Sequence, residues 1–361
     1  MFNKIYIKHI VSIFFSRFIF ITLIFTSLIF ILNILEEIKF FSKNGEAEIF
    51  LPIILTFLNL PSTLFELFPF IILISTQFFF IKFQENSEIL IFKNNGINNL
   101  KIIFNLCIFV FLIGIFLISV FHFLSSTMKR NYLEFKNKYT TDSKYLAVIN
   151  ENGLWIKDKL NDQIMIIHSE RIDENILSNI IITTFNQDFQ ILKNIIGKSA
   201  IINDKLWEIN DVVEIDNFGK KNNIDKLLFQ TNFDYLKINS MFSKLDSLNI
   251  YELYKQKKDF LNVGMTVSDI DLYLNKLYAY PLSLVLFLVI TSVLMFNVKF
   301  KKSKTAVIIF GILLSVIIYY IYYFFGLLAT NNYIPALLAI WLPNLIIFLT
   351  CLIGLITVNE K

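Results

Sequence analysis

Few side chains in this sequence have the types and spacing that covalent chemistry or metal binding needs. The three histidines, His9, His122 and His168, are far apart and lack metal-ligand spacing. Gly197-Lys198-Ser199 resembles the end of a phosphate-binding loop, but that motif needs a glycine five residues earlier, where Leu192 stands. The sequence has no nucleophile elbow, paired carboxylates or HExxH helix. It therefore predicts a protein that is not an enzyme and has no cofactor of its own.

Residues 84–96, QENSEILIFKNNG, have the composition of a short helix between two apolar runs. Asn86 or Ser87 can cap its start, and Glu88 suits the positive end of the helix dipole. Gly96 suits the C′ position, where a left-handed backbone ends many helices. We predict a short amphipathic helix outside the membrane.

The apolar face of this helix contains Ile89, Leu90 and Phe92 and must be buried against something. One interpretation is a helix lying on the membrane interface. The other is a coupling helix docked in a groove of a separate cytoplasmic subunit. The residues alone leave both open.

Lys39 and Lys43 follow the first apolar run. They suit either interfacial anchors or contacts to an anionic head group, because an ammonium is a compact point charge. The neighbouring Glu36 and Glu37 weaken the second interpretation.

Four tyrosines crowd a later apolar run, and a glutamate lies inside an earlier one. An aromatic belt explains some of the tyrosines, but four so close on a helix cannot all face one way. We therefore expect some, with Tyr319 and Tyr322 as candidates for substrate binding, to face the bundle or a cavity. Glu66 either faces a water-filled cavity or extends to the interface. The tyrosines are Tyr319, Tyr320, Tyr322 and Tyr323.

The elements that position these residues follow from composition. Hydrophobic residues make up 55% of the chain and charged residues 17%, against about a quarter charged in soluble proteins. A bilayer core needs about 20 apolar residues per helix. Six runs qualify: 10–35, 62–81, 102–124, 280–298, 305–328 and 336–357. The first is too long for a cleaved signal peptide, so we interpret it as a retained span.

Charge predicts the orientation of the spans. Basic residues are concentrated in the N-terminus and in the links 82–101 and 299–304, whereas the links 36–48 and 329–335 are acidic or uncharged. The positive-inside rule then places both termini in the cytoplasm and residues 128–265 outside. The small net charge of +4 does not suggest nucleic-acid binding.

The outer region contains short β-branched runs separated by turn residues, which predicts a sandwich or jelly roll. The runs are 145–149, 153–158, 163–172, 179–185, 189–197, 198–203 and 205–215, followed by a helical stretch at 241–275. We expect an α-helical membrane protein with three domains. Residues 1–127 hold three transmembrane helices and the segment 84–96, residues 128–265 form a periplasmic β-jelly-roll-like domain, and residues 266–361 hold three more helices.

Four segments resemble a known family. They are SEILIFKNNG at 87–96, GLWIKD at 153–158, YAYPLSLVLFLVI at 278–290 and WLPN at 341–344. With the three-plus-three order of spans, the whole chain resembles the LptF/LptG (YjgP/YjgQ-type) permeases of the lipopolysaccharide export ABC transporter. GLWIKD and IYIKHI at 5–10 favour the LptG-like member.

The resemblance implies a multi-pass inner-membrane permease subunit without enzymatic activity. It would pair with a second homologous permease and a dimeric cytoplasmic ATPase, which binds ATP. The complex would extract lipopolysaccharide from the inner membrane, through a cavity formed mainly by the first and fifth spans of both permeases, and pass it to a periplasmic bridge protein. Glu88 matches the family's coupling glutamate, and Lys39 matches a basic residue that meets lipid phosphate. Asn33 and Phe40 stand at other positions that are basic in the family.

An alternative function remains open at the level of sequence. A membrane-anchored periplasmic scaffold or sensor without transport activity would need no ATPase and would tolerate changes at residues 87–96.

Overall fold

The computed structural model describes residues 2–43, 50–138, 154–160, 163–173, 175–187, 190–233, 238, 244–262, 266–297 and 304–359. The chain divides into two compact units. The first contains Met1–Lys129 and Ser268–Lys361, and the second contains Arg130–Val267. The predicted strand at 145–149, the glycine that opens GLWIKD and the side chain of Lys43 lie outside the described part.

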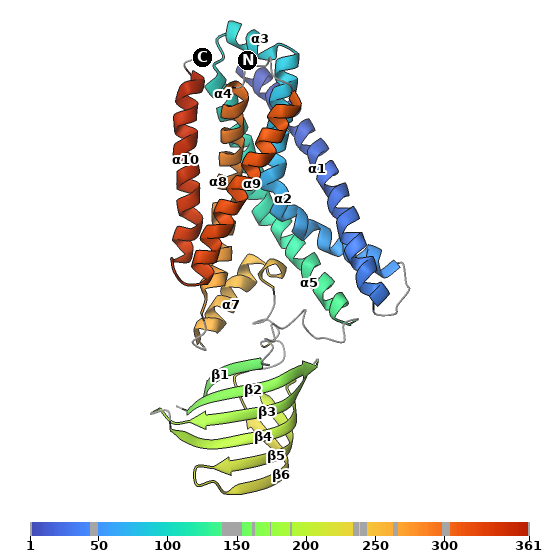
Figure 1. The fold of residues 1–361 in the computed structure, drawn as a ribbon, viewed down its shortest axis with the longest axis vertical. Helices are drawn as coiled ribbons and strands as arrows, with labels where there is room; N and C mark the ends of the chain where they lie inside the picture. The colour runs from blue at the N-terminus through green and yellow to red at the C-terminus, as the bar shows by residue number, and fades with distance from the viewer. Residues whose placement is uncertain are drawn as a thin grey trace. The chain divides into compact units, whose positions relative to one another are not determined.

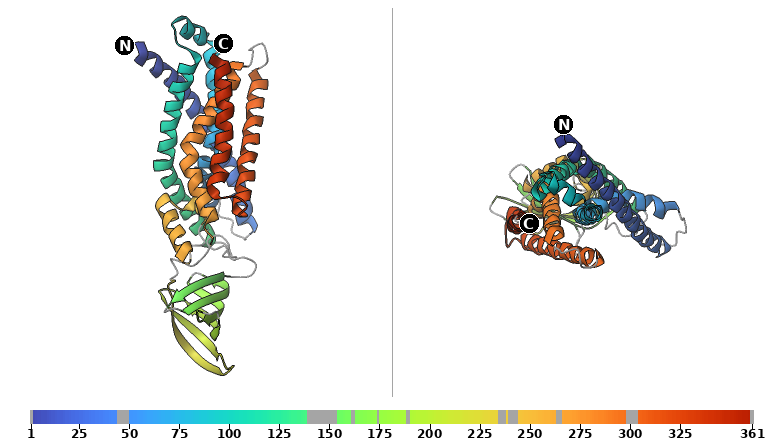
Figure 2. Two further views of the ribbon diagram at one scale, coloured as in Figure 1. Left: turned by 90° about the vertical axis from the view of Figure 1, so that its left-hand side faces the viewer. Right: turned by 90° about the horizontal axis from the view of Figure 1, so that it is seen from above.

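The first unit is a bundle of long helices. Within the described residues, six helices are long and apolar enough to cross a membrane, which confirms the predicted number of spans. In Figures 1 and 2 they run side by side, and α3 lies at the end of the bundle where α1 begins and α10 ends. The helices are α1 (Phe2–Lys43), α2 (Phe50–Glu85), α3 (Glu88–Asn94), α4 (Asn99–Phe116), the π-helical turn η1 (Leu117–Phe121), α5 (His122–Lys138), α8 (Ser268–Asn297), α9 (Lys304–Thr330) and α10 (Ala336–Asn359). The part of α5 from Arg130 onward belongs to the second unit.

Several helices extend beyond the apolar runs that predicted them. α1 has 42 residues, about 63 Å at the α-helical rise and far more than a hydrocarbon core of about 30 Å. Pro52 and Pro61, which precede the predicted second span, both lie within α2. Pro52 is in the first turn, where a missing N–H costs nothing. Pro343 is likewise inside an unbroken α10.

Close contact between α4 and α8 depends on Gly114. A Cβ built on this residue would lie 2.7 Å from the Cα of Pro281 and 2.9 Å from its Cβ. Backbone atoms in a packed bundle cannot yield as a flexible side chain can. Small residues at helix interfaces permit such an approach in membranes.

We expect Gly114→Ala to destabilise the helical unit by about 1 to 3 kcal/mol, because the added methyl overpacks the α4–α8 contact. Gly326→Ala is the matched control, because its new Cβ would meet only Leu272, at 3.9 Å. Thermal unfolding of the full chain in detergent should show a lower midpoint for the first variant alone. Equal midpoints would show that the α4–α8 contact accommodates the added methyl group without loss of stability.

The second unit contains a six-stranded antiparallel sheet in the order β1-β2-β3-β4-β5-β6. It lies in sequence between the third and fourth spans and is consistent with the predicted jelly-roll-like domain. The strands are β1 (Leu154–Leu160), β2 (Gln163–Asp173), β3 (Ile176–Phe185), β4 (Ile191–Ile201), β5 (Leu206–Asp216) and β6 (Lys221–Gln230). The 3-10 turn η2 (Leu245–Ser247) and the helix α7 (Ile250–Asn262) follow.

Two strands differ from the prediction. The runs 189–197 and 198–203 form the single strand β4, with Gly197 inside it. This glycine is not a turn: a Cβ there would lie 2.3 Å from Cγ2 of Ile209 on β5, so Gly197 allows a close approach of two strands. β6 was not predicted, because its sequence begins with the polar run KNNIDK. The helical stretch 241–275 is divided between α7 and the start of α8.

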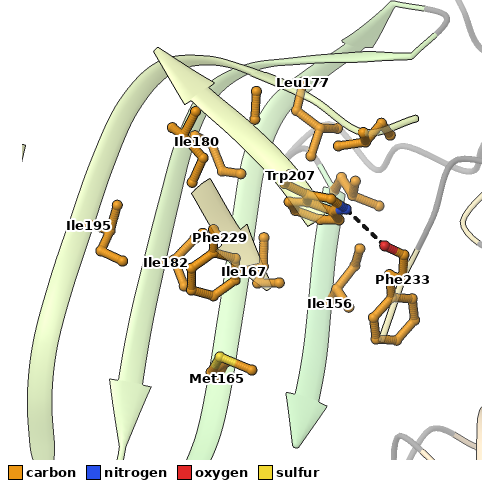
Figure 3. Packing of buried hydrophobic residues seen from close by; sticks show 14 of the residues in the cluster. Ile156, Met165, Ile167, Leu177, Ile180, Ile182, Ile195, Trp207, Phe229 and Phe233 are labelled. Atoms are coloured by element: carbon orange, nitrogen blue, oxygen red, sulfur yellow. Dashed lines mark hydrogen bonds between the residues drawn. The ribbon is translucent and has the colours of Figure 1, made fainter. Parts of the chain in front are cut away.

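One face of the sheet carries the core of this unit (Figure 3). Trp207 is fully buried, and its indole N–H donates to the carbonyl of Phe233 at 2.8 Å. The buried carboxylate of Asp158 on β1 accepts hydrogen bonds from Thr231 Oγ1 at 2.6 Å and from the Asn232 backbone N–H at 2.9 Å. These residues follow β6, so the sheet curls until the chain beyond its last strand meets its first.

Candidate functional site

The predicted coupling segment forms α3, and its start differs in detail from the prediction. Ser87 is the N-cap residue but has φ of 55° and makes no capping hydrogen bond through its side chain. Asn86 instead donates from Nδ2 to Glu88 Oε1 at 2.9 Å. The asparagine therefore orients the carboxylate instead of capping the helix.

The end of α3 is a Schellman motif. Gly96 has φ of +77°, and its N–H donates to the carbonyl of Lys93 at 2.9 Å. The N–H of Ile97 donates to the carbonyl of Phe92, also at 2.9 Å. This double closure satisfies terminal carbonyls and requires a left-handed residue at C′, which glycine adopts without strain.

The apolar residues of α3 face in different directions. Phe92 packs inward, stacking on Phe83 with ring centroids 5.3 Å apart and meeting Tyr6 of α1 edge-on. Ile89 is half-buried. Leu90 is 63% exposed and Ile91 56% exposed. The helix is thus attached to its own chain through Phe92 and presents an adjacent apolar pair outward.

Glu88 is joined to α1 by a residue that sequence reasoning missed. Its Oε2 lies 2.9 Å from His9 Nε2, and its side chain is only 15% exposed. The two residues are 79 positions apart, so no local pattern could have paired them. Tyr6 and His9 on α1 therefore connect the start of that long helix to α3.

A cavity of about 430 Å³ lies between α2, α8, α9 and α10. Tyr319 and Tyr322, predicted as substrate-binding residues, both line it, as does Tyr323. Tyr320 of the same run is not among the lining residues and is 63% exposed.

Hydrogen bonds fix one side of this cavity. The hydroxyl of Tyr322 donates to Asn344 Oδ1 at 2.8 Å, and the hydroxyl of Ser283 donates to the same oxygen at 3.0 Å. Asn344 itself donates from Nδ2 to the carbonyl of Ile340 at 2.9 Å. The WLPN segment therefore forms a contact between α8, α9 and α10.

The basic candidates lie apart from this cavity. Lys39 is exposed near the end of α1 and does not line the cavity, and Lys43 is the last residue of the helix. Within the described ranges, no group of three or more His, Cys, Asp or Glu side chains is placed to hold a metal ion.

Comparison with known families decides the class of protein. A family model described as the lipopolysaccharide export system permease LptF/LptG matches residues 8–357, nearly the whole chain. The chain belongs to the LptF/LptG family. It is therefore a permease component of lipopolysaccharide export and not an enzyme, and with six apolar helices it is a multi-pass inner-membrane protein.

The match to the LptF/LptG family confirms the resemblance of the sequence segments. It covers both members of the family together, so assignment to the LptG-like member stays a prediction. Comparison with curated proteins finds no match.

Proposed function

We propose that this chain is the transmembrane permease subunit of an ABC transporter that extracts lipopolysaccharide from the inner membrane and passes it to a periplasmic bridge. The observation that carries the proposal is α3, with its oriented Glu88 and its exposed pair Leu90 and Ile91. Two adjacent apolar side chains that are exposed on a short helix with a Schellman C-terminus suit insertion into a groove of another protein.

The partner at α3 is a dimeric cytoplasmic ATPase, which supplies the bound ATP. Phe92 and Glu88 bind α3 to α2 and α1 through Phe83 and His9. A displacement of α3 by the ATPase therefore acts directly on the start of α1. This supports transmission of ATP-driven motion into the span expected to contact the lipid.

The orientation follows from the distribution of charge. Basic residues in the N-terminus and in the links 82–101 and 299–304 favour a cytoplasmic location for both termini and for α3. The unit Arg130–Val267 is then periplasmic. Among the described residues, β1 and β6 are the edge strands of its sheet. An edge with unpaired backbone groups can pair with a strand of the bridge protein.

The lipid is bound by the membrane-spanning helices of this chain. A second homologous permease contributes to the same binding site. Tyr319 and Tyr322 contribute a cavity wall, and Lys39 and Lys43 contribute positive charge near the end of α1. Ammonium groups there suit the phosphates of a lipopolysaccharide head group. Because Asn33 and Phe40 carry no charge, we expect the second permease to supply further cations.

Glu88→Ala is expected to lower ATP-driven lipopolysaccharide transport by about tenfold or more, because a charge-assisted hydrogen bond contributes about 1.5 to 3 kcal/mol. The measurement is ATP-dependent release of lipopolysaccharide from proteoliposomes containing the assembled complex. Asp204→Ala, which removes an exposed carboxylate in the turn between β4 and β5, is the control and should transport normally. Normal transport by Glu88→Ala would contradict the coupling role of Glu88. Absence of ATP-dependent release by the unaltered complex would favour a scaffold or sensor without transport activity.

A further inference from the structure

Two opposite charges line the cavity between α2, α8, α9 and α10. Glu66 comes from α2 and Lys276 from α8, and both side chains are exposed. Within the part of the chain that the structure describes, neither forms a hydrogen bond or an ion pair. An acid and a base thus face one space without neutralising each other directly.

The cavity lies toward the ends of the predicted spans, on the side where α9 ends. Glu66 is inside the apolar run of the second span, and Lys276 is one turn before Tyr280 at the start of the fourth. The lining includes Thr330, the last residue of α9. Ionisable residues inside a span are rare, and they almost always face the bundle interior or a water-filled cavity that serves a substrate or ion.

The remaining lining residues suit a polar head attached to an apolar tail. Tyr319 and Tyr323 stack with ring centroids 6.4 Å apart and are about half exposed. Aromatic faces attract a cation, and tyrosine hydroxyls donate to anionic oxygens. Pro69, Phe70 and Phe287 add apolar surface.

We propose that this cavity binds a phosphoethanolamine head group. Its ammonium donates to the Glu66 carboxylate, and its phosphate accepts from the Lys276 ammonium. Charge-assisted hydrogen bonds of this kind are the strong ones, and they are strengthened by low dielectric. A purely anionic head group satisfies Lys276 but is repelled by Glu66.

The phosphoethanolamine can come from a bilayer phospholipid or from a lipopolysaccharide decorated with this group. All of the residues belong to one chain, so the inference depends neither on the ATPase nor on the proposed coupling. Failure of this inference and failure of the proposed function are therefore separable.

The test uses the full chain purified in detergent and titrated with single lipids, with bound lipid counted by native mass spectrometry. We expect phosphatidylethanolamine to bind about tenfold more tightly than phosphatidylglycerol, the worth of one charge-assisted contact. Glu66→Gln should abolish that preference, and Lys276→Met should weaken the binding of both lipids. The control Asp204→Asn, in the exposed turn between β4 and β5, should change neither. Equal binding of the two lipids, or an unaltered preference in Glu66→Gln, would overturn the proposal.

A second measurement needs no substitution. Carbodiimide labelling of Glu66 in the unaltered chain should decrease when phosphatidylethanolamine or decorated lipopolysaccharide is added, and the more protective of the two identifies the source. Lipopolysaccharide without phosphoethanolamine should not protect. Equal protection by the undecorated lipid, or none by either phosphoethanolamine lipid, would contradict the site.

Discussion

Replacing Leu90 with aspartate is expected to release the ATPase from the transporter, with affinity lowered at least about tenfold. Leu90 lies beside Ile91 on α3 and is 63% exposed. The contact that holds α3 against α2 is made instead by Phe92, which stacks on Phe83. The substitution should therefore leave the fold intact. A carboxylate carried into an apolar groove loses its hydration without gaining a partner, which costs several kcal/mol.

The measurement is the amount of ATPase that co-purifies with the chain from detergent-solubilised membranes. Phe218→Asp is the matched control, because Phe218 is 89% exposed in the hairpin between β5 and β6. We expect the control to retain the ATPase. If Leu90→Asp also retained it, α3 would be a helix of the membrane interface and not a docking element.

Trp207→Ala is expected to destabilise the second unit by about 3 to 5 kcal/mol, the usual cost of deleting a fully buried aromatic side chain. The indole fills the core between Leu177 and Ile156 in Figure 3. Its loss also leaves the carbonyl of Phe233 without the indole donor. The curled end of the sheet should loosen with the core, because Asp158 binds the residues just before Phe233.

Limited proteolysis of the full chain in detergent should show faster cleavage within Arg130–Val267 for this variant. Trp155→Ala is the control: Trp155 is 53% exposed, and its ring lies against that of His168 at an interplanar angle of 45° with centroids 4.2 Å apart. Losing that pair should cost only about 1 kcal/mol. Equal protease sensitivity of the two variants would show that the buried indole does not hold the sheet together.

The large features of the fold were predictable because they depend on long-range averages of composition. Each span is an apolar run of bilayer length, so hydropathy located all six. The same criterion missed the true end of α1. The apolar run ends before Glu36 and Glu37, although the backbone stays helical to Lys43. Strand β6 was not predicted for a related reason. Its core residue Phe229 follows a polar stretch that lacks the alternation of apolar and polar residues seen in other strands.

Parts of the candidate site depended on contacts between distant segments and were not predictable. Gly96 could be placed at the end of α3 because a local rule governs that position. The pairing of Glu88 with His9, and the shared cavity of Glu66 and Lys276, arise only when separate helices pack together. Periodicity along one helix says which residues share a face, not what that face meets.

The central claim is that this chain works as one permease of an ATPase-driven lipopolysaccharide exporter. The most direct measurement is purification of the tagged full chain from its native membrane, with identification of every stoichiometric partner. We predict that a cytoplasmic ATPase, present as a dimer, and one second permease of the same family co-purify with it. Purification of the chain without an ATPase, under conditions that preserve known membrane complexes, would contradict the claim.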